Sequence, residues 1–93
     1  MASTPTASRE DAVCRVCGLA QSEPPWGEDD RVPIFDICDC CGTEFGYEDC
    51  TIDSVKAARA RWLANRMPWF SPALRPADWD VDKQLLSVPS KYR

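Results

Sequence analysis

The chain has 93 residues, with 15 acidic and 11 basic side chains, no histidine and a formal net charge of −4. This length predicts a single small domain. A chain so short buries little apolar surface, so it often needs an additional stabilising element such as a bound metal ion. The negative charge argues against a general affinity for nucleic acid, which depends on neutralising phosphates.

The six cysteines fit either a secreted disulfide scaffold or a set of metal ligands. Residues 1–13 contain no apolar run of signal-peptide length, and no segment approaches the length of a membrane span. We therefore expect a cytoplasmic protein, without a membrane anchor, whose cysteines are thiols or metal ligands.

In chain order, residues 1–11 are small and polar and are predicted to be a disordered tail. Two Cys-x-x-Cys-Gly motifs follow, here called the first knuckle (residues 14–18) and the second knuckle (residues 38–42). Their sulfurs come from Cys14, Cys17, Cys38 and Cys41, in the pattern C-x2-C-x20-C-x2-C. Two such pairs at this spacing predict a site for one structural Zn²⁺, because zinc takes four thiolates in a tetrahedron.

The segments around the second knuckle predict short β-strands. Val32–Ile37 is rich in β-branched and aromatic residues, and Thr43–Tyr47 would return beside it. Two knuckles on short antiparallel strands form a zinc ribbon, which we expect over residues 12–50.

A helical extension is expected over residues 51–88. Thr51 or Asp53 would cap a helix over 54–66, which Met67-Pro68 would end. Apolar residues at helical spacing would form its buried stripe: Val55, Ala58, Trp62 and Leu63. A second, short helix is expected around Val81–Leu86. A metal ribbon has almost no core of its own, so the C-terminal helix and its tryptophans should pack on it. The predicted fold is thus a small metal-stabilised α+β domain: a zinc ribbon with a C-terminal helical segment packed on it.

The remaining cysteines are not expected to bind the metal. Cys40 lies inside the second knuckle, and using it as a ligand would lose the position of the following glycine. Cys50 is interpreted as a free thiol. Without histidine the chain lacks the commonest general base, and four cysteines leave no open position on a metal. We therefore do not expect an enzyme.

The stretch Ile37–Asp49 (ICDCCGTEFGYED) resembles the second knuckle of the bacterial cysteine-rich CPCC family. The similarity continues in Arg61-Trp62, Trp69–Pro72, Pro76–Asp80 and Gln84-Leu85, and spans about residues 13–86. Arg15 and Asp39 stand where the family has prolines inside the knuckles.

The resemblance implies a zinc-ribbon-like fold with Cys14, Cys17, Cys38 and Cys41 as metal ligands. It implies little about biochemistry, although proteins of this kind could act as immunity or accessory partners in bacterial conflict systems.

Three functions remain open from the sequence. The favoured one is a protein–protein interaction or accessory module with a structural zinc and an unidentified protein partner. A rubredoxin-like iron protein for electron transfer would use the same pair of knuckles. A nucleic-acid-binding ribbon would use the basic helix at residues 56–66, because residues 54–76 contain five basic side chains and no acidic one.

Overall fold

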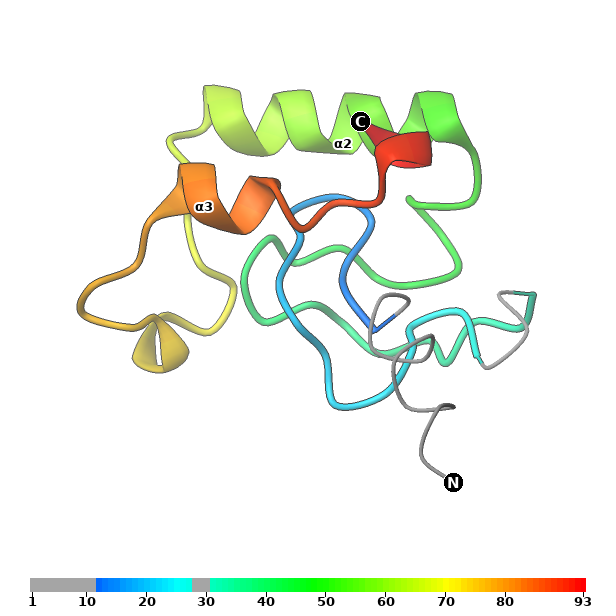
Figure 1. Ribbon diagram of the computed structural model, residues 1–93, viewed down its shortest axis with the longest axis horizontal. Helices are drawn as coiled ribbons and strands as arrows, with labels where there is room; N and C mark the ends of the chain where they lie inside the picture. The colour runs from blue at the N-terminus through cyan, green and yellow to red at the C-terminus, as the bar shows by residue number, and fades with distance from the viewer. Residues whose placement is uncertain (1–11, 28–30) are drawn as a thin grey trace.

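The computed structural model describes residues 12–27 and 31–93. These residues form two α-helices, α2 (Ile52–Ala64) and α3 (Val81–Leu85), and two 3-10 turns, η1 (Pro72–Leu74) and η2 (Ser90–Tyr92). Figure 1 shows α2 across the top of the molecule, with α3 and η2 beneath it and the two cysteine loops below them. The predicted tail, residues 1–11, lies outside the described residues.

The two knuckles fold into the same tight turn. In each, the glycine N–H donates to the carbonyl of the first cysteine, whose own N–H donates to the residue after the glycine. The bonds are Gly18 to Cys14 and Cys14 to Leu19 in the first knuckle, and Gly42 to Cys38 and Cys38 to Thr43 in the second, each 2.9 Å long. Both glycines have positive φ, +84° at Gly18 and +78° at Gly42, which a residue without a Cβ adopts at no steric cost.

The prediction of a zinc ribbon is wrong. In residues 12–27 and 31–93 there is no β-strand and no sheet. Each knuckle is instead closed by one isolated antiparallel bridge, Val13 with Ala20 and Ile37 with Glu44. The knuckles are therefore loops, and nothing in the described chain forms the strands on which we expected to find them.

The backbone around Phe35 explains why Val32–Ile37 is not a strand. Phe35 has a φ of +62°, in the left-handed region, which interrupts an extended run. Pro33 has no N–H to donate to a ladder. The N–H of Ile34 donates to the carbonyl of Pro25 at 2.9 Å, so it closes a loop instead of pairing with residues 43–47. The β-branched composition was therefore misleading as a strand signal, and Val32, Phe35 and Ile37 are 70%, 57% and 42% exposed.

The helix α2 starts two residues earlier than predicted and uses one of the two predicted caps. Thr51 and Ser54 form a reciprocal capping box, in which each side chain accepts the other's backbone N–H. The helix ends before Arg66 and Met67, whose φ angles of +70° and +57° turn the chain back toward the knuckles. No helix in the described part of the chain is long and apolar enough to cross a membrane.

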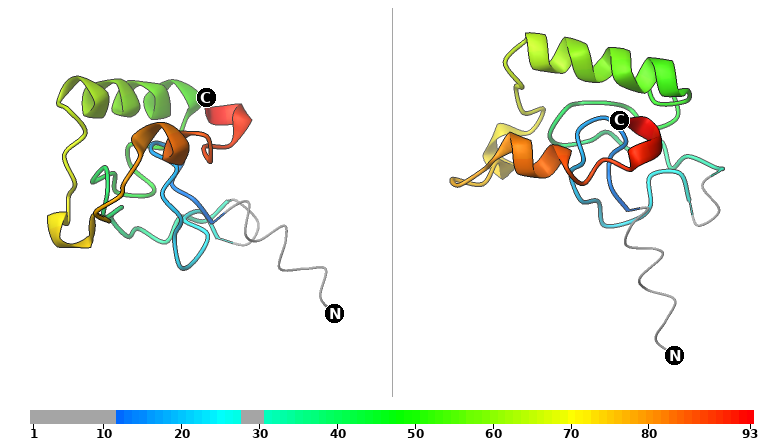
Figure 2. Two further views of the ribbon diagram at one scale, coloured as in Figure 1. Left: turned by 60° about the vertical axis from the view of Figure 1, so that its left-hand side comes forward. Right: turned by 45° about the horizontal axis from the view of Figure 1, so that its top comes forward.

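The core joins the knuckles to the C-terminal half of the chain. From α2, Val55, Ala58 and Trp62 are buried, whereas Leu63, which we expected in the same stripe, is 40% exposed. The buried residues form one cluster: Cys14, Val16, Cys17, Cys38, Cys40, Phe45, Val55, Ala58, Trp62, Trp69, Val88 and Tyr92. Because five of these twelve residues lie in the two knuckles, the sulfur site is part of the buried core of the described chain. Figure 2 shows α2, α3 and η2 around the cysteine loops from two further directions.

Three tryptophans join the end of α2 to the start of α3. The ring of Trp79 lies 5.4 Å from that of Trp69, edge to face, and 6.2 Å from that of Trp62. The Nε1 of Trp62 donates to the carbonyl of Pro68 at 3.0 Å. These contacts match the preferred geometry of aromatic pairs and close the long connection between the helices.

The knuckle glycines provide a paired test of this packing. A Cβ at Gly18 would overlap the carbonyl oxygen of Gln84, whereas a Cβ at Gly42 would lie 3.3 Å from a ring carbon of Phe70, a side chain that can move. We expect Gly42→Ala to lower the free energy of unfolding by about 1–2 kcal/mol, the cost of a Cβ at positive φ. Gly18→Ala should cost more, about 3 kcal/mol or above, because a backbone atom must also shift.

Denaturant unfolding of the wild type and the two variants measures this difference. Equal losses in the two variants would contradict the close contact between the first knuckle and the end of α3.

Candidate metal centre

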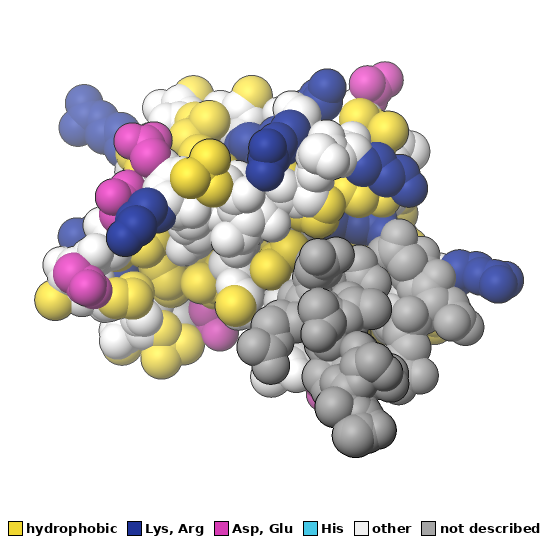
Figure 3. All heavy atoms as spheres, viewed as in Figure 1, with side chains coloured by type: hydrophobic (Ala, Val, Ile, Leu, Met, Phe, Trp, Pro, Cys, Tyr) yellow, Lys and Arg dark blue, Asp and Glu magenta, His cyan; other side chains and the backbone are white. Residues whose placement is uncertain are grey.

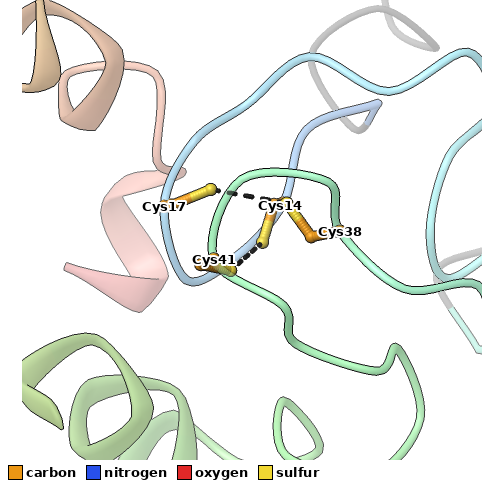
Figure 4. A group of neighbouring side chains, drawn as sticks. All are labelled: Cys14, Cys17, Cys38 and Cys41. Carbon is orange, nitrogen blue, oxygen red and sulfur yellow. Dashed lines mark hydrogen bonds between the residues drawn. The ribbon is translucent and has the colours of Figure 1, made fainter. Parts of the chain in front are cut away.

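The structure brings together the four cysteines predicted from the motif. The Sγ atoms of Cys14, Cys17, Cys38 and Cys41 all lie within 4.8 Å of one another, and this group could hold a metal ion. Figure 4 shows the two knuckles facing each other with their sulfurs between them. The shortest separations, 3.6 Å each, join sulfurs of different knuckles: Cys14 to Cys41 and Cys17 to Cys38.

These separations match a metal tetrahedron better than disulfides. Zn–S bonds of about 2.3 Å in a tetrahedron place the sulfurs about 3.8 Å apart. A disulfide would instead bring two sulfurs to about 2.05 Å. All six cysteines are free thiols in this structure. The four sulfurs thus lie at the spacing that a tetrahedrally coordinated metal ion needs. The secreted disulfide alternative would not place four sulfurs at this spacing.

Burial makes the four sulfurs a poor place for negative charge without a cation. Cys14, Cys17 and Cys38 have no exposed surface. Burial raises the pKa of the Cys14 thiol well above its usual value. Hydrogen bonding to Cys14 raises the pKa of Cys17, and hydrogen bonds from Cys14 and Cys17 lower the pKa of Cys38. The thiols are therefore hydrogen-bonded to one another through their remaining protons. A bound cation would replace those protons, because coordination deprotonates a thiol.

Arg59 fastens α2 to the first knuckle and to the C-terminus. Its guanidinium donates to the carbonyls of Val16 at 2.7 Å, Arg15 at 3.0 Å, Tyr92 at 2.6 Å and Arg93 at 3.5 Å. Burial lowers the pKa of Arg59, while negative charge on Cys14 and Cys17 raises it. A single cation thus satisfies the carbonyls at the tip of the knuckle and lies close to two of the sulfurs.

Gln84 of α3 provides a second anchor on the same knuckle. Its Nε2 donates to the carbonyl of Cys17 at 3.1 Å and to the sulfur of Cys40 at 3.4 Å. Its Oε1 accepts from Nε1 of Trp79 at 2.8 Å, so the amide orientation is determined from both sides. The tip of the first knuckle is therefore enclosed by α2, α3 and η2.

The second knuckle is held by the chain that follows α2. The N–H of Ser71 donates to the carbonyl of Asp39 at 2.8 Å, and the N–H of Phe70 to that of Cys40 at 3.0 Å. The hydroxyl of Ser71 also donates to the carboxylate of Asp39 at 3.0 Å. Asp39, one of the two departures from the CPCC pattern, thus makes a contact that a proline could not make.

Arg15, the other departure, lies buried between two aromatic rings. Its guanidinium carbon is 4.3 Å from the ring centre of Trp26 and 4.5 Å from that of Tyr92. It also donates to the carbonyl of Asp49 at 3.0 Å. Cation–π contacts of this kind are stronger when desolvated. Arg15 thereby joins the first knuckle to the loop before the second and to the end of the chain.

The two remaining cysteines have different surroundings. Cys40 is fully buried, and hydrogen bonding to Cys17 lowers its pKa, yet its sulfur is not part of the four-sulfur group. Cys50 is exposed, and its thiol donates to the carbonyl of Gly46 at 3.1 Å.

Sequence reasoning missed the side chains that position the sulfurs. Arg59 and Gln84 act on carbonyls far away in the sequence, so no local pattern marks them. Arg15 did offer one signal in the sequence: it is a cation placed between the two cysteines of the first knuckle. Arg59 was instead interpreted as part of a basic helix face, whereas its guanidinium points toward the knuckle.

Comparisons with protein-family models, with curated proteins and with solved structures found no match for this chain. The resemblance to the CPCC family therefore stays an interpretation of the motifs.

Replacing Arg59 tests the anchoring of the first knuckle. Arg59→Lys should lower the free energy of unfolding by about 2–4 kcal/mol, because a compact ammonium group cannot reach all the carbonyls that the guanidinium serves. Arg61→Lys is the matched control, since Arg61 is exposed and lies 3.8 Å from Glu48 in a surface pair, and it should cost less than about 1 kcal/mol. Thermal and denaturant unfolding report both values, and similar losses for the two variants would refute the anchor.

Adjacent cysteines test which sulfurs bind the metal. Cys41→Ser should lower zinc affinity by at least about 100-fold, because it removes a thiolate ligand. Cys40→Ser should retain about one ion per chain, since its sulfur is not in the four-sulfur group. Competition with a chromophoric chelator measures both affinities. Loss of metal from the Cys40 variant alone would reverse the assignment of the two residues.

Proposed function

We propose that this protein is a small protein–protein interaction module stabilised by one structural Zn²⁺ ion that Cys14, Cys17, Cys38 and Cys41 bind. The observation that carries the proposal is the convergence of four cysteine sulfurs within 4.8 Å, three of them fully buried. Four sulfurs complete a tetrahedral coordination sphere and leave no position for a substrate, which favours a structural over a catalytic ion.

The size of the core supports a structural role for the ion. The buried cluster has twelve residues, and five of them belong to the knuckles themselves, so little apolar core remains if the four sulfurs separate. Zinc contributes about 10–16 kcal/mol in finger-sized peptides at neutral pH, which is as large as the whole stability of many domains. Folding of this chain would therefore be coupled to metal binding.

Exposed apolar side chains support a protein partner. Phe35, Tyr47, Phe70, Leu74 and Leu86 are each 57–69% exposed. Aromatic side chains are enriched at protein interfaces.

The arrangement of charges does not favour nucleic acid. Arg59 is occupied by carbonyls inside the molecule, and Arg61 lies 3.8 Å from Glu48. Figure 3 shows basic and acidic side chains mixed on the face in view, without one continuous basic patch. A nucleic-acid interface would need several unpaired cations along one groove. An accessory or immunity role in a bacterial conflict system would be a special case of the same proposal.

Metal analysis of protein purified without added metal tests the proposal first. We expect about one zinc per chain and no visible absorbance, with loss of folded structure when a strong chelator removes the ion. One iron per chain with strong visible absorbance would instead establish the electron-transfer alternative. Absence of both metals from a folded protein would refute the structural-ion proposal.

The interaction role has a separate test. Leu74→Asp and Tyr47→Asp place a charge on exposed apolar positions and should abolish binding of a partner that co-purifies with the wild type. Lys56→Asp, on the exposed side of α2, is the control and should retain that partner. A partner retained by all three variants, or none recovered with the wild type, would count against an interaction module at these surfaces.

A further inference from the structure

The four ligand cysteines differ in their access to solvent. Cys14, Cys17 and Cys38 have no exposed surface, whereas Cys41 is only partly buried. The first knuckle is covered by Arg59 and Gln84, and the amide of Gln21 donates to the sulfur of Cys38 at 3.6 Å. Among the described residues, the four-sulfur site is therefore closed around three sulfurs and open to solvent beside Cys41.

A groove of about 200 Å³ lies at this open position. One wall consists of Cys41, Gly42 and Thr43, and the opposite wall includes Arg61 and Asn65 at the end of α2. The thiol of Cys41 donates to the hydroxyl oxygen of Thr43 at 3.1 Å. The volume exceeds that of several water molecules, so a hydrated ion or one arm of a small chelator can enter it.

We propose that this groove is the route by which the metal ion enters and leaves the four-sulfur site, with Cys41 as the first ligand to exchange. The inference rests on the proposed metal site. In the exchange, the bond from the metal to the Cys41 sulfur breaks, the thiolate takes a proton from solvent, and a donor atom of the incoming chelator takes the free coordination position. No electrons are transferred, and the three buried sulfurs keep hold of the ion until the new bond has formed.

Glu48 is the transient ligand in this groove. Its carboxylate borders the same cavity as Cys41 and is held only by the N–H of Glu44 at 3.4 Å and by Arg61 at 3.8 Å. Both contacts are long, and the side chain of Glu48 is 48% exposed, so the carboxylate can turn toward an ion at little cost. A carboxylate next to a thiolate provides the intermediate binding step for a divalent cation.

An entry route has a kinetic signature that a ligand does not have. Narrowing the route raises the barrier for both directions, so the rates of metal uptake and release fall by the same factor while Kd is unchanged. Loss of a ligand or of a structural contact instead changes Kd. The two roles are therefore separable even when a variant lowers the rate of release.

The experiment uses zinc-loaded, full-length protein. Zinc release is followed with the chelator 4-(2-pyridylazo)resorcinol, Cd²⁺ replacement is followed by cadmium–thiolate absorbance, and Kd is obtained by competition at equilibrium. Asn65→Trp fills the groove from the end of α2, and Glu48→Gln removes the transient ligand. Lys56→Trp and Asp82→Asn are their controls, at exposed positions that do not border the groove.

We expect Asn65→Trp and Glu48→Gln each to slow release and replacement by about tenfold, equivalent to about 1.4 kcal/mol in the barrier, with Kd unchanged. The two control variants should exchange at the wild-type rate. Unchanged rates in both groove variants, or slower exchange accompanied by a matching change in Kd, would overturn the route. Failure of the wild type to bind either ion would overturn the structural-zinc proposal and this one together, so the two failures are distinguishable.

Thiol trapping gives a readout that does not depend on the groove variants. In zinc-loaded Cys50→Ser protein, which lacks the exposed thiol, N-ethylmaleimide should modify Cys41 before any other cysteine. First modification at Cys14, Cys17 or Cys38 would show that the ion leaves by another path and would overturn the proposal.

Discussion

The close burial of four cysteine sulfurs is the constraint on which the rest of this structure depends. Four thiolates within 4.8 Å of one another would repel strongly in a medium of low polarity, and thiols kept neutral there make only weak hydrogen bonds. A tetrahedral cation satisfies all four at once. The remainder of the fold can be understood as the means of keeping the two knuckles face to face at that distance.

The C-terminal half of the chain does this by binding the knuckle carbonyls. The side chain of Arg59 donates to the carbonyls of Arg15 and Val16, and that of Gln84 donates to the carbonyl of Cys17. The backbone N–H groups of Ser71 and Phe70 donate to the carbonyls of Asp39 and Cys40. In a zinc ribbon these loops would be supported by strand pairing. Here side chains and backbone from α2, α3 and the segment between them replace the sheet, so the domain can be small without strands in its described residues.

The two knuckles are covered to different extents by the rest of the chain, and this difference affects the chemistry of the four-sulfur site. The first knuckle lies under α2, α3 and η2, whereas the second leaves Cys41 beside a groove at the end of α2. A metal site with one accessible ligand can keep a fixed structure and still exchange its ion. Glu48 and Arg61 line the same groove, so substitutions there change the charge at the edge of the site while the buried sulfurs stay unaltered.

The sequence by itself determined the local chemistry: the four converging cysteines, the glycine turns after each pair, a helix cap at Thr51 or Asp53, and a buried helix stripe that includes Val55, Ala58 and Trp62. These are properties of short segments, because cysteine spacing, positive φ at glycine and helical periodicity act over a few residues. The strands were predicted from β-branched composition, but the left-handed backbone of Phe35 and the hydrogen bond from Ile34 to Pro25 overrode that preference.

Only the tertiary structure decided which side chains hold the knuckles and which sulfur is accessible. Arg59 and Gln84 act across 43 and 67 residues, on Val16 and Cys17, and no pattern along the chain encodes such a partner. The exposure of Cys41 relative to the other three cysteines of the group likewise depends on where α2 ends beside the second knuckle. Contacts of this kind arise from packing between distant segments, so they become visible only when the chain is folded.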